Sequence, residues 1–292
     1  MARVLARLTE NAPGEFFVDD ACIDCETCRG IAPDVFVRSD RVGMSIVARQ
    51  PGSEGESLRA KMALVACPTS AIGTESKVDV RGAVEAFPEP LAEGVHYCGF
   101  ASARSFGASS YLVVRPGGNV LVDSPRAARP LMDRLAELGG VDLMFLSHRD
   151  DVADHAKFRR RFRCERVLAA ADVDSSTREV ERLIEGNDPV ALAPDLLAIP
   201  VPGHTRGSLA LLYAHRFLFT GDHLWGVEHS DRLDASRSVC WYSWSEQVRS
   251  LERLLAFDFE WVLPGHGSRF HAPRPGARRA LEELLRRIRT GR

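Results

Sequence analysis

Short apolar runs, each closed by a polar or glycine-containing turn, recur along the chain from residue 94 onward. This pattern is typical of buried strands. We expect strands at Tyr111–Val114, Val120–Val122, Val141–Leu146, Arg166–Ala170, Leu196–Val201, Leu209–Tyr213, Phe217–Phe219 and Trp261–Leu263. The turn Pro116-Gly117-Gly118-Asn119 lies between the first two runs and predicts a hairpin.

Stretches with apolar residues at helical spacing lie between these strands. They predict helices at Arg126–Leu138, Val152–Phe162, Thr177–Glu185 and Ser245–Phe257. We expect Asp151 to cap the second of these helices, and Ser243 with Glu246 to form a capping box for the last. The alternation of strands and helices predicts an α/β fold.

The final stretch, from Arg269 to Arg292, is rich in arginine. Its apolar residues fall on one helical stripe, formed by Ala280, Leu281, Leu284, Leu285 and Ile288. The pattern favours a terminal helix that docks through this stripe and leaves a basic face in solvent. The alternative is a basic patch that binds an acidic partner or RNA.

The first quarter of the chain carries a different signal, Cys22-Ile-Asp-Cys25-Glu-Thr-Cys28, followed at a distance by Cys67-Pro68. Three thiolates at this spacing can wrap around one face of a cubane, and a fourth completes the coordination. From Phe16 to Ile72 the chain resembles bacterial-type ferredoxins that carry one [4Fe–4S] cluster, which implies these four cysteines as ligands. A structural zinc site and buried free thiols are the alternatives.

Composition limits the choice of class without deciding it. The chain has 292 residues, 45% of them hydrophobic, a net charge of −2 and an odd number of cysteines, seven. No apolar run is long enough to span a bilayer, and the first ten residues predict no signal peptide. We therefore expect a cytoplasmic protein with no membrane partner, whose cysteines serve ligation rather than disulfides.

From Gly73 to Pro90 the composition changes to glycine, serine, proline and charged residues, which predicts a connector between two domains. We place the boundary near residue 80, with a small domain at 1–80 and a large domain at 81–292, joined by a linker at 80–90.

Imidazoles and carboxylates cluster after apolar runs of the large domain. The stretch Ser147–His155 contains His148, Asp150 and the pair Asp154-His155, and later runs are followed by His204, Asp222 and His266. Because strand ends gather at one edge of a sheet, these residue types predict a metal site there.

From Pro88 to His271 the order of these motifs resembles the metallo-β-lactamase superfamily. The resemblance implies a four-layer αββα sandwich with a two-metal site at one edge of its sheets. It implies His148 and His204 at one metal, with Asp222 bridging to the other. Asp154, His155 and His266 would hold the second metal, and Asp154 and Asp222 would be the catalytic carboxylates.

The chain departs from the family at one point. The family motif H-x-H-x-D-H has a second histidine where this chain has Asp150, and two extra residues precede Asp154. Asp150 or Asp151 would then supply that ligand. A carboxylate there hardens the ligand set and suits iron or manganese at least as well as zinc. The flavodiiron branch of the superfamily also has a carboxylate in this position, although it is a glutamate without the insertion.

Three functions follow from these features. As an oxidoreductase, the chain would pass electrons from the cluster to a di-iron site. As a hydrolase, two metals would activate water against an ester, thioester, lactam or phosphoester. As a sensor, the cluster would report redox state. We favour the oxidoreductase, acting on a small molecule and served by a redox partner protein, because a fused electron carrier is of no use to a zinc hydrolase. Nucleic acid is not expected as a partner.

Overall fold

The computed structural model describes residues 2–291. They form two compact units. The first unit contains the chain up to Arg115 together with Ser124–Val141 and Ala153–Phe162. The second contains Pro116–Asp123, Asp142–Val152 and the chain from Arg163 onward. The domain boundary near residue 80 stays a prediction.

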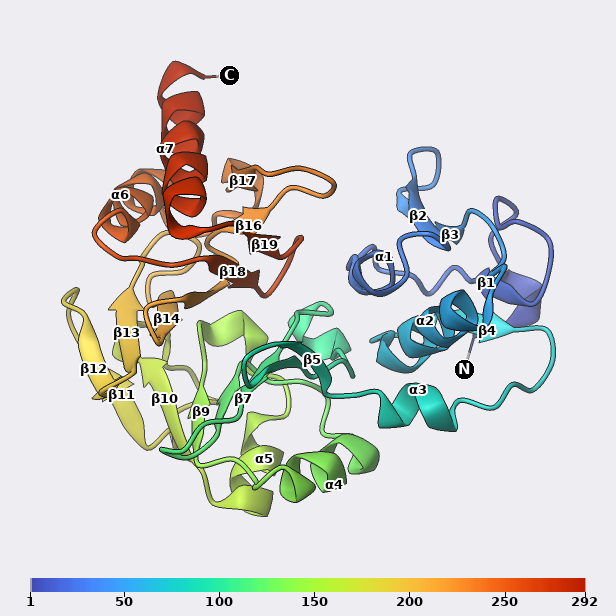
Figure 1. The fold of residues 1–292 in the computed structure, drawn as a ribbon, viewed down its shortest axis with the longest axis horizontal. Coiled ribbons are helices and arrows are strands. Elements are labelled where there is room, and N and C mark those ends of the chain that lie inside the picture. The colour runs from blue at the N-terminus through green and yellow to red at the C-terminus, as the bar shows by residue number, and fades with distance from the viewer. Residues whose placement is uncertain (1, 292) are drawn as a thin grey trace. The chain divides into compact units, whose positions relative to one another are not determined.

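The N-terminal part of the first unit is built from short elements (Figure 1). They are η1 (Val4–Ala6), β1 (Phe16–Val18), α1 (Thr27–Ile31), β2 (Phe36–Ser39), β3 (Met44–Val47), α2 (Glu54–Ala66) and β4 (Ile72–Thr74). β1 pairs antiparallel with β4, and β2 with β3. The Ser53 side chain caps α2 by accepting from the Glu56 amide, and Ala60 and Ala63 bury its inner face.

The rest of the first unit, within the described residues, holds three strands, three α-helices and one 3₁₀ helix. They are α3 (Arg81–Glu85), β5 (Glu89–Ala92), β6 (Val95–Tyr97), η2 (Ala103–Ser105), β7 (Tyr111–Val113), α4 (Arg129–Glu137) and α5 (His155–Phe162). β5, β6 and β7 form an antiparallel meander. The predicted strand at residues 111–114 is confirmed as β7.

The second unit contains two sets of strands. The first set is parallel, in the order β8 (Val120–Val122), β9 (Leu143–Phe145), β10 (Glu165–Ala169) and β11 (Arg182–Ile184). The second runs in the order β12 (Val190–Ala193), β13 (Leu196–Pro200), β14 (Leu209–Tyr213), β15 (Phe217–Gly221), β18 (Trp261–Pro264) and β19 (Phe270–His271). In that sheet only β15 and β18 pair in parallel. Smaller elements of the unit are η3 (Arg149–Asp151), η4 (Ala170–Asp172), η5 (Arg237–Val239) and the hairpin β16 (Trp225–Gly226) with β17 (Leu233–Asp234).

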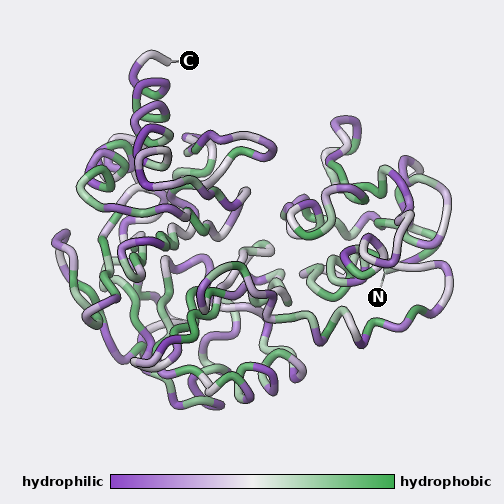
Figure 2. Tube along the Cα trace, in the orientation of Figure 1, coloured by the Kyte–Doolittle hydropathy of each residue, from purple (hydrophilic) through white to green (hydrophobic). Residues whose placement is uncertain are grey.

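Two helices of the second unit, α6 (Trp244–Leu254) and α7 (Arg274–Thr290), share a core with the second sheet. Leu251 of α6 and Leu281 of α7 are buried together with Leu218 and Val262 of the strands. Alternating apolar and polar bands are visible along α7 in Figure 2. Each fully buried leucine contributes about 1.5–3 kcal/mol. The predicted terminal helix with its docked apolar stripe is confirmed.

Three helix predictions need correction. The predicted helix at Thr177–Glu185 is wrong, because that stretch is a turn followed by β11, which pairs parallel with β10. The helix predicted from Val152 begins only at His155, after a single 3₁₀ turn at Arg149–Asp151. Asp151 is therefore not its cap. The helix predicted from Arg126 begins at Arg129, where Pro130 fits the first turn.

Of the helices within residues 2–291, none combines the length and apolar character that a bilayer crossing requires.

Candidate metal centre

The turn after β9 fixes His148 in place. The Ser147 amide donates to Asp123 Oδ1 at 2.7 Å, and its carbonyl accepts from the Leu209 amide, also at 2.7 Å. The side chain of His148 is 1% exposed, and its Nδ1 lies 2.9 Å from Ser147 Oγ. Its other nitrogen, Nε2, is thereby turned toward the carboxylates that follow in the same turn.

His204 follows β13 and is oriented in a similar way. Its Nδ1 lies 2.5 Å from the Val239 carbonyl oxygen, so Nδ1 carries the proton and Nε2 presents a lone pair. The rings of His204 and His148 lie 4.8 Å apart and nearly perpendicular. Both histidines are thus preset as ligands through Nε2.

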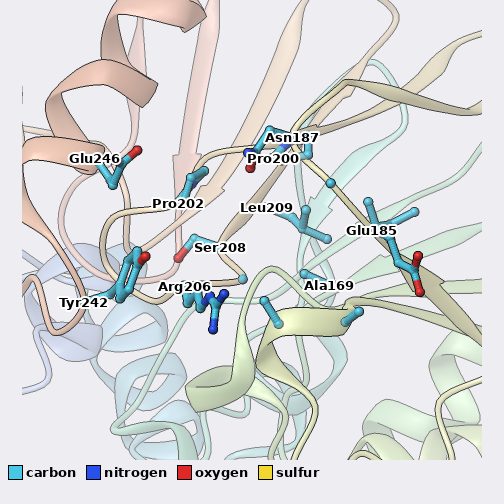
Figure 3. Close-up of a pocket in the computed structure, with 15 residues that line it drawn as sticks. Ala169, Glu185, Asn187, Pro200, Pro202, Arg206, Ser208, Leu209, Tyr242 and Glu246 are labelled. Carbon is cyan, nitrogen blue, oxygen red and sulfur yellow. The ribbon is translucent and has the colours of Figure 1, made fainter.

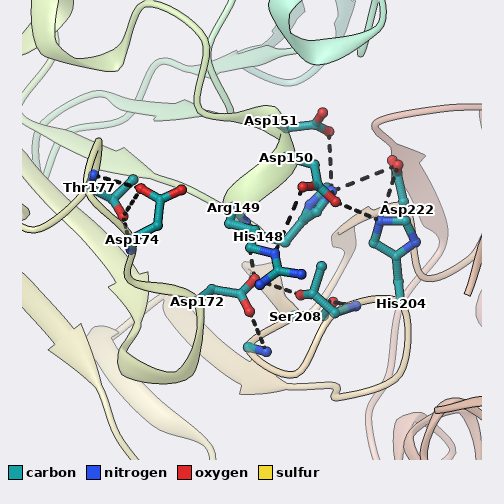
Figure 4. A network of polar contacts seen from close by, with 12 residues as sticks. His148, Arg149, Asp150, Asp151, Asp172, Asp174, Thr177, His204, Ser208 and Asp222 are labelled. Carbon is teal, nitrogen blue, oxygen red and sulfur yellow. Dashed lines mark hydrogen bonds and ion pairs between the residues drawn. The ribbon is translucent and has the colours of Figure 1, made fainter. Parts of the chain in front are cut away.

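Asp222, which follows β15, lies between three histidines. Its Oδ2 is 3.8 Å from His148 Nε2, 3.7 Å from His204 Nε2 and 3.9 Å from His266 Nε2. Figure 4 shows Asp222 facing His148 and His204. Ligand atoms about 2.0–2.2 Å from a common metal ion stand at separations of this order.

Two further carboxylates approach from η3. Asp150 Oδ2 lies 3.5 Å from His204 Nε2 and 4.0 Å from His148 Nε2, and its side chain is 47% exposed. Asp151 is 2% exposed, with Oδ2 4.0 Å from His148 Nε2. A Cβ placed on Gly265 would lie 2.7 Å from Asp151 Oδ2 and 2.7 Å from Asp222 Oδ1. The backbone before His266 therefore approaches closely because residue 265 has no side chain.

The electrostatics of this group favour a cation. Burial raises the pKa of Asp151 well above its usual range, and repulsion from Asp222 and Asp123 adds to the effect. Burial also raises the pKa of Asp123 to about 7. By contrast, burial lowers the pKa of His148. Carboxylates packed this closely repel one another when they are ionised, and a cation bound between them would relieve that repulsion.

The hydrogen bonding of this group also favours a bound cation. Four of the buried side-chain atoms that lack a hydrogen-bond partner within residues 2–291 belong to this group: His148 Nε2, His204 Nε2, Asp151 Oδ2 and Asp222 Oδ1. The ligand atoms fall into two overlapping groups, His148–Asp150–His204 and His148–Asp151–Asp222, each within 4.8 Å. Buried polar atoms left unpaired in this way are costly, and metal ions would satisfy them. The residues fit the metal ions that the sequence predicts.

Asp172, at the end of η4, was not predicted from the sequence. It is 1% exposed. Its Oδ2 accepts from the Arg149 amide at 3.0 Å and from Thr205 Oγ1 at 2.6 Å, and its Oδ1 accepts from the Gly207 amide at 2.7 Å. One carboxylate therefore ties the His148 turn to the His204 turn (Figure 4). Its only signal in the sequence was a position just after the predicted strand at 166–170.

Asp154 and His155 lie at the start of α5, in the first unit. Asp154 Oδ2 accepts from the Ala127 amide at 2.9 Å, and Oδ1 lies 2.9 Å from Lys157 Nζ and 3.6 Å from Arg104 Nη1. Donors thus engage both of its oxygens. The assignment of Asp154 and His155 as ligands stays a prediction.

The four cysteines of the N-terminal motif come together. Cys22, Cys25, Cys28 and Cys67 line one hollow of the first unit. Burial raises the pKa of the Cys28 thiol to about 12, so its thiolate needs a bound cation or cluster. The Ala71 amide donates to Cys67 Sγ at 3.3 Å, as backbone amides do to cluster sulfurs. These residues fit a cluster that they would ligate together.

A cavity of about 520 Å³ opens beside the His204 turn (Figure 3). Arg206 and Ser208, which follow His204, line it, and so does Tyr242, whose amide donates to the His204 carbonyl. Cavities of this size accommodate small-molecule ligands.

Comparisons with known proteins agree with this architecture. Residues 18–74 match the family of the 4Fe-4S single cluster domain of ferredoxin I. A hydroxyacylglutathione hydrolase from Fuscovulum blasticum is 31% identical over 134 residues, which is 44% of this chain and 52% of that protein. The match thus spans about half the length of this curated relative.

Among solved structures, VMB-1 is similar with a TM-score of 0.52 and 15% identity, over 70% of this chain and 96% of that chain. A metallo-β-lactamase superfamily protein from Sulfolobus tokodaii has a TM-score of 0.48 and 18% identity, over 68% of this chain and 87% of that chain.

Proposed function

The chain joins a single-cluster [4Fe–4S] ferredoxin domain to a domain with the metallo-β-lactamase fold, and from this premise we propose that it is an oxidoreductase. In this proposal the cluster would supply electrons to a two-metal centre that acts on a small molecule. The observation that carries the proposal is the donor set around Asp222. It supplies three carboxylates with the buried histidines, and such hard donors suit iron.

The ligands divide over two positions. His148, His204 and Asp150 would hold the first metal, Asp151 and His266 would hold the second, and Asp222 would serve both. In this assignment Asp151 takes the position that the family resemblance gives to Asp154. The Asp154 carboxylate already accepts a hydrogen bond from the Ala127 amide and forms ion pairs with Lys157 and Arg104.

Two irons bound there would supply Lewis acidity and a redox couple. The chain's own residues do the positioning. Ser147 and the Val239 carbonyl hold the two imidazoles with Nε2 inward, and Asp172 keeps their turns in register. The cavity beside His204 binds the substrate, with Arg206 as a cation for an anionic group of that molecule.

A hydrolase is the second candidate, and one observation favours it. The curated relative is named a hydroxyacylglutathione hydrolase. In this alternative two zinc ions at the same ligands would activate water against a thioester, and the cluster would be structural or regulatory. In either case we propose a cytoplasmic protein, and the redox enzyme draws its electrons from a separate partner protein.

Metal analysis of anaerobically purified full-length protein tests the choice. The redox proposal expects about six irons per chain, and about four irons with two zincs would contradict it. Single turnover adds a second readout. After reduction of the cluster and removal of excess reductant, electrons should appear at the two-metal centre as a change in its spectroscopic signal.

A Cys25→Ala chain is the matched control for that experiment. It should lose the reduction of the two-metal centre and the activity. If instead the metals stay redox-silent and the Cys25→Ala chain hydrolyses thioesters as fast as the unmodified chain, the hydrolase replaces the oxidoreductase.

A further inference from the structure

The segment Ala101–Ala108 lies against both halves of the cluster site. At one end the Ala101 amide donates to the carbonyl of Ala66, the residue before Cys67, at 3.1 Å. At the other end Gly107 lies against Cys25. All of these residues belong to the first unit. The segment follows the predicted linker in sequence, so it belongs to the predicted large domain.

Gly107 approaches the cluster motif in a way that no other residue could. Its φ is +88°, a conformation that favours glycine. A Cβ at this position would lie 2.5 Å from Cys25 Cβ, 2.8 Å from Cys25 Sγ and 3.3 Å from Pro68 Cγ. The backbone of the segment therefore covers Cys25 and the residue after Cys67.

Arg126 adds a further tether. Its guanidinium donates to the Val65 carbonyl at 3.0 Å, and its amide donates to the Phe100 carbonyl at 2.8 Å. Arg126 thus ties the residue before the segment to the end of α2, next to the hydrogen bond that Ala101 makes there.

The hydroxyl of Thr27 links the segment to the sulfur of Cys25. Thr27 Oγ1 lies 3.1 Å from the Gly107 carbonyl oxygen and 3.3 Å from Cys25 Sγ. A cluster-bound thiolate and a carbonyl can only accept hydrogen bonds, whereas a threonine hydroxyl has one proton to donate. The Gly107 carbonyl and the Cys25 sulfur therefore compete for the same proton.

We propose that Thr27 and Gly107 couple the reduction potential of the [4Fe–4S] cluster to the position of the segment Ala101–Ala108. When Gly107 lies close, its carbonyl shares the Thr27 proton with the sulfur and weakens the hydrogen bond to the sulfur. When the segment moves away, the hydroxyl turns fully to the sulfur. The proposal rests on the cluster of the proposed function but not on the chemistry at the two-metal centre.

The direction of the effect follows from charge. Reduction adds an electron to the cluster, so a hydrogen bond to a cluster sulfur stabilises the reduced form and raises the potential. A closely held segment gives a lower potential than a displaced one. The large domain thereby sets the driving force of the electrons that the cluster carries.

The test is a redox titration of the full-length chain, followed by electron paramagnetic resonance, with iron content measured on each sample. Thr27→Val removes the hydroxyl and keeps the shape, and it should lower the potential. Thr27→Ser retains the hydroxyl and should restore the potential. Gly107→Ala pushes the segment off Cys25 and should raise the potential.

The double variant separates this coupling from simple exposure of the cluster to water. In a Thr27→Val background, Gly107→Ala should lose most of its upward shift. Gly140→Ala is the matched control, because Gly140 has a φ of +81° but its nearest contact is Phe162 at 3.5 Å. It should leave the potential unchanged.

Two results would overturn the proposal. One is a Thr27→Val chain with full iron and an unchanged potential, a readout that holds even if Gly107→Ala fails to bind a cluster. The other is an equal upward shift by Gly107→Ala with and without the hydroxyl. A two-metal centre that proves to be a zinc hydrolase would refute the proposed function and leave this coupling intact.

Discussion

Asp172 offers the sharpest test of how the metal centre is built. Replacing it with alanine removes the acceptor for the Arg149 amide, the Thr205 hydroxyl and the Gly207 amide. The first donor lies in the turn that carries His148, and the other two lie in the turn after His204. Asp172→Ala should therefore loosen both histidines without touching a ligand.

The magnitude follows from the bonds that are lost. Hydrogen bonds to a charged acceptor contribute about 1.5–3 kcal/mol each, and water entering the gap recovers part of the loss. Because Thr205 and Gly207 are buried, we expect Asp172→Ala to lower the free energy of unfolding by about 3–5 kcal/mol. Removing residues that orient ligands lowers metal affinity about 10–100-fold, and we expect a loss in that range.

Two measurements on the full-length chain check these values. Urea unfolding of the metal-free protein gives the stability, and titration of the metal-free protein with iron or zinc gives the affinity. Asp172→Asn keeps one acceptor oxygen and should fall between the alanine variant and the unmodified chain. Asp174→Ala is the control, since Asp174 also accepts from backbone amides, those of Ser176 and Thr177, but contacts neither histidine turn.

The reasoning would be refuted by an Asp172→Ala chain that is destabilised as expected but binds metal as tightly as the unmodified protein. That result would mean that the His148 and His204 turns hold their geometry without a shared brace. Equal losses of metal affinity in Asp172→Ala and Asp174→Ala would likewise show a general rather than a specific effect.

Three further predictions follow from the sites. Cys67→Ala should abolish the visible absorbance of the anaerobically reconstituted cluster and its iron; an unchanged spectrum would exclude Cys67 as a ligand. Asp222→Ala should lose both metals of the two-metal centre, whereas His204→Ala and His266→Ala should each mainly disturb one metal; metal analysis measures the difference. Asp123 has a folded pKa raised to about 7 from a usual value of 3.8, so its cost to stability is absent at low pH and complete above about pH 7. Metal-free protein should therefore lose thermal stability between about pH 4 and pH 7, and Asp123→Asn, which still accepts from Ser147, should weaken that dependence; an identical pH profile would contradict the assignment.

Much of this protein can be predicted from local sequence. Continuous apolar runs place β13, β14 and β15, which are buried on both faces, and the period-3.6 pattern places α6 and α7, which each bury one face. The cysteine spacing predicts the cluster motif, because thiolates are among the few side chains that hold iron–sulfur clusters. The histidines at strand ends and Asp222 likewise predict the metal centre, because imidazoles and carboxylates are common metal ligands.

Only the tertiary structure shows how the surroundings of the carboxylates after His148 differ. The family resemblance favours Asp154 for the second metal, yet Asp151 is buried beside Asp222 while Asp154 forms an ion pair with Lys157. The stretch 177–185 has helical spacing but pairs its end with β10, since a neighbouring strand offers the backbone partners that a short isolated helix lacks.

Asp172 and Gly107 show the same division. An aspartate after a strand and a glycine in a loop carry no special signal in the sequence. Two hydrogen-bond donors of Asp172 lie 23 and 35 residues away along the chain, and Gly107 contacts the distant Cys25. Sequence determines which groups can bind metal, accept a proton or adopt positive φ. Which of them meet depends on long-range packing, where the burial of a whole core outweighs the preference of any single residue.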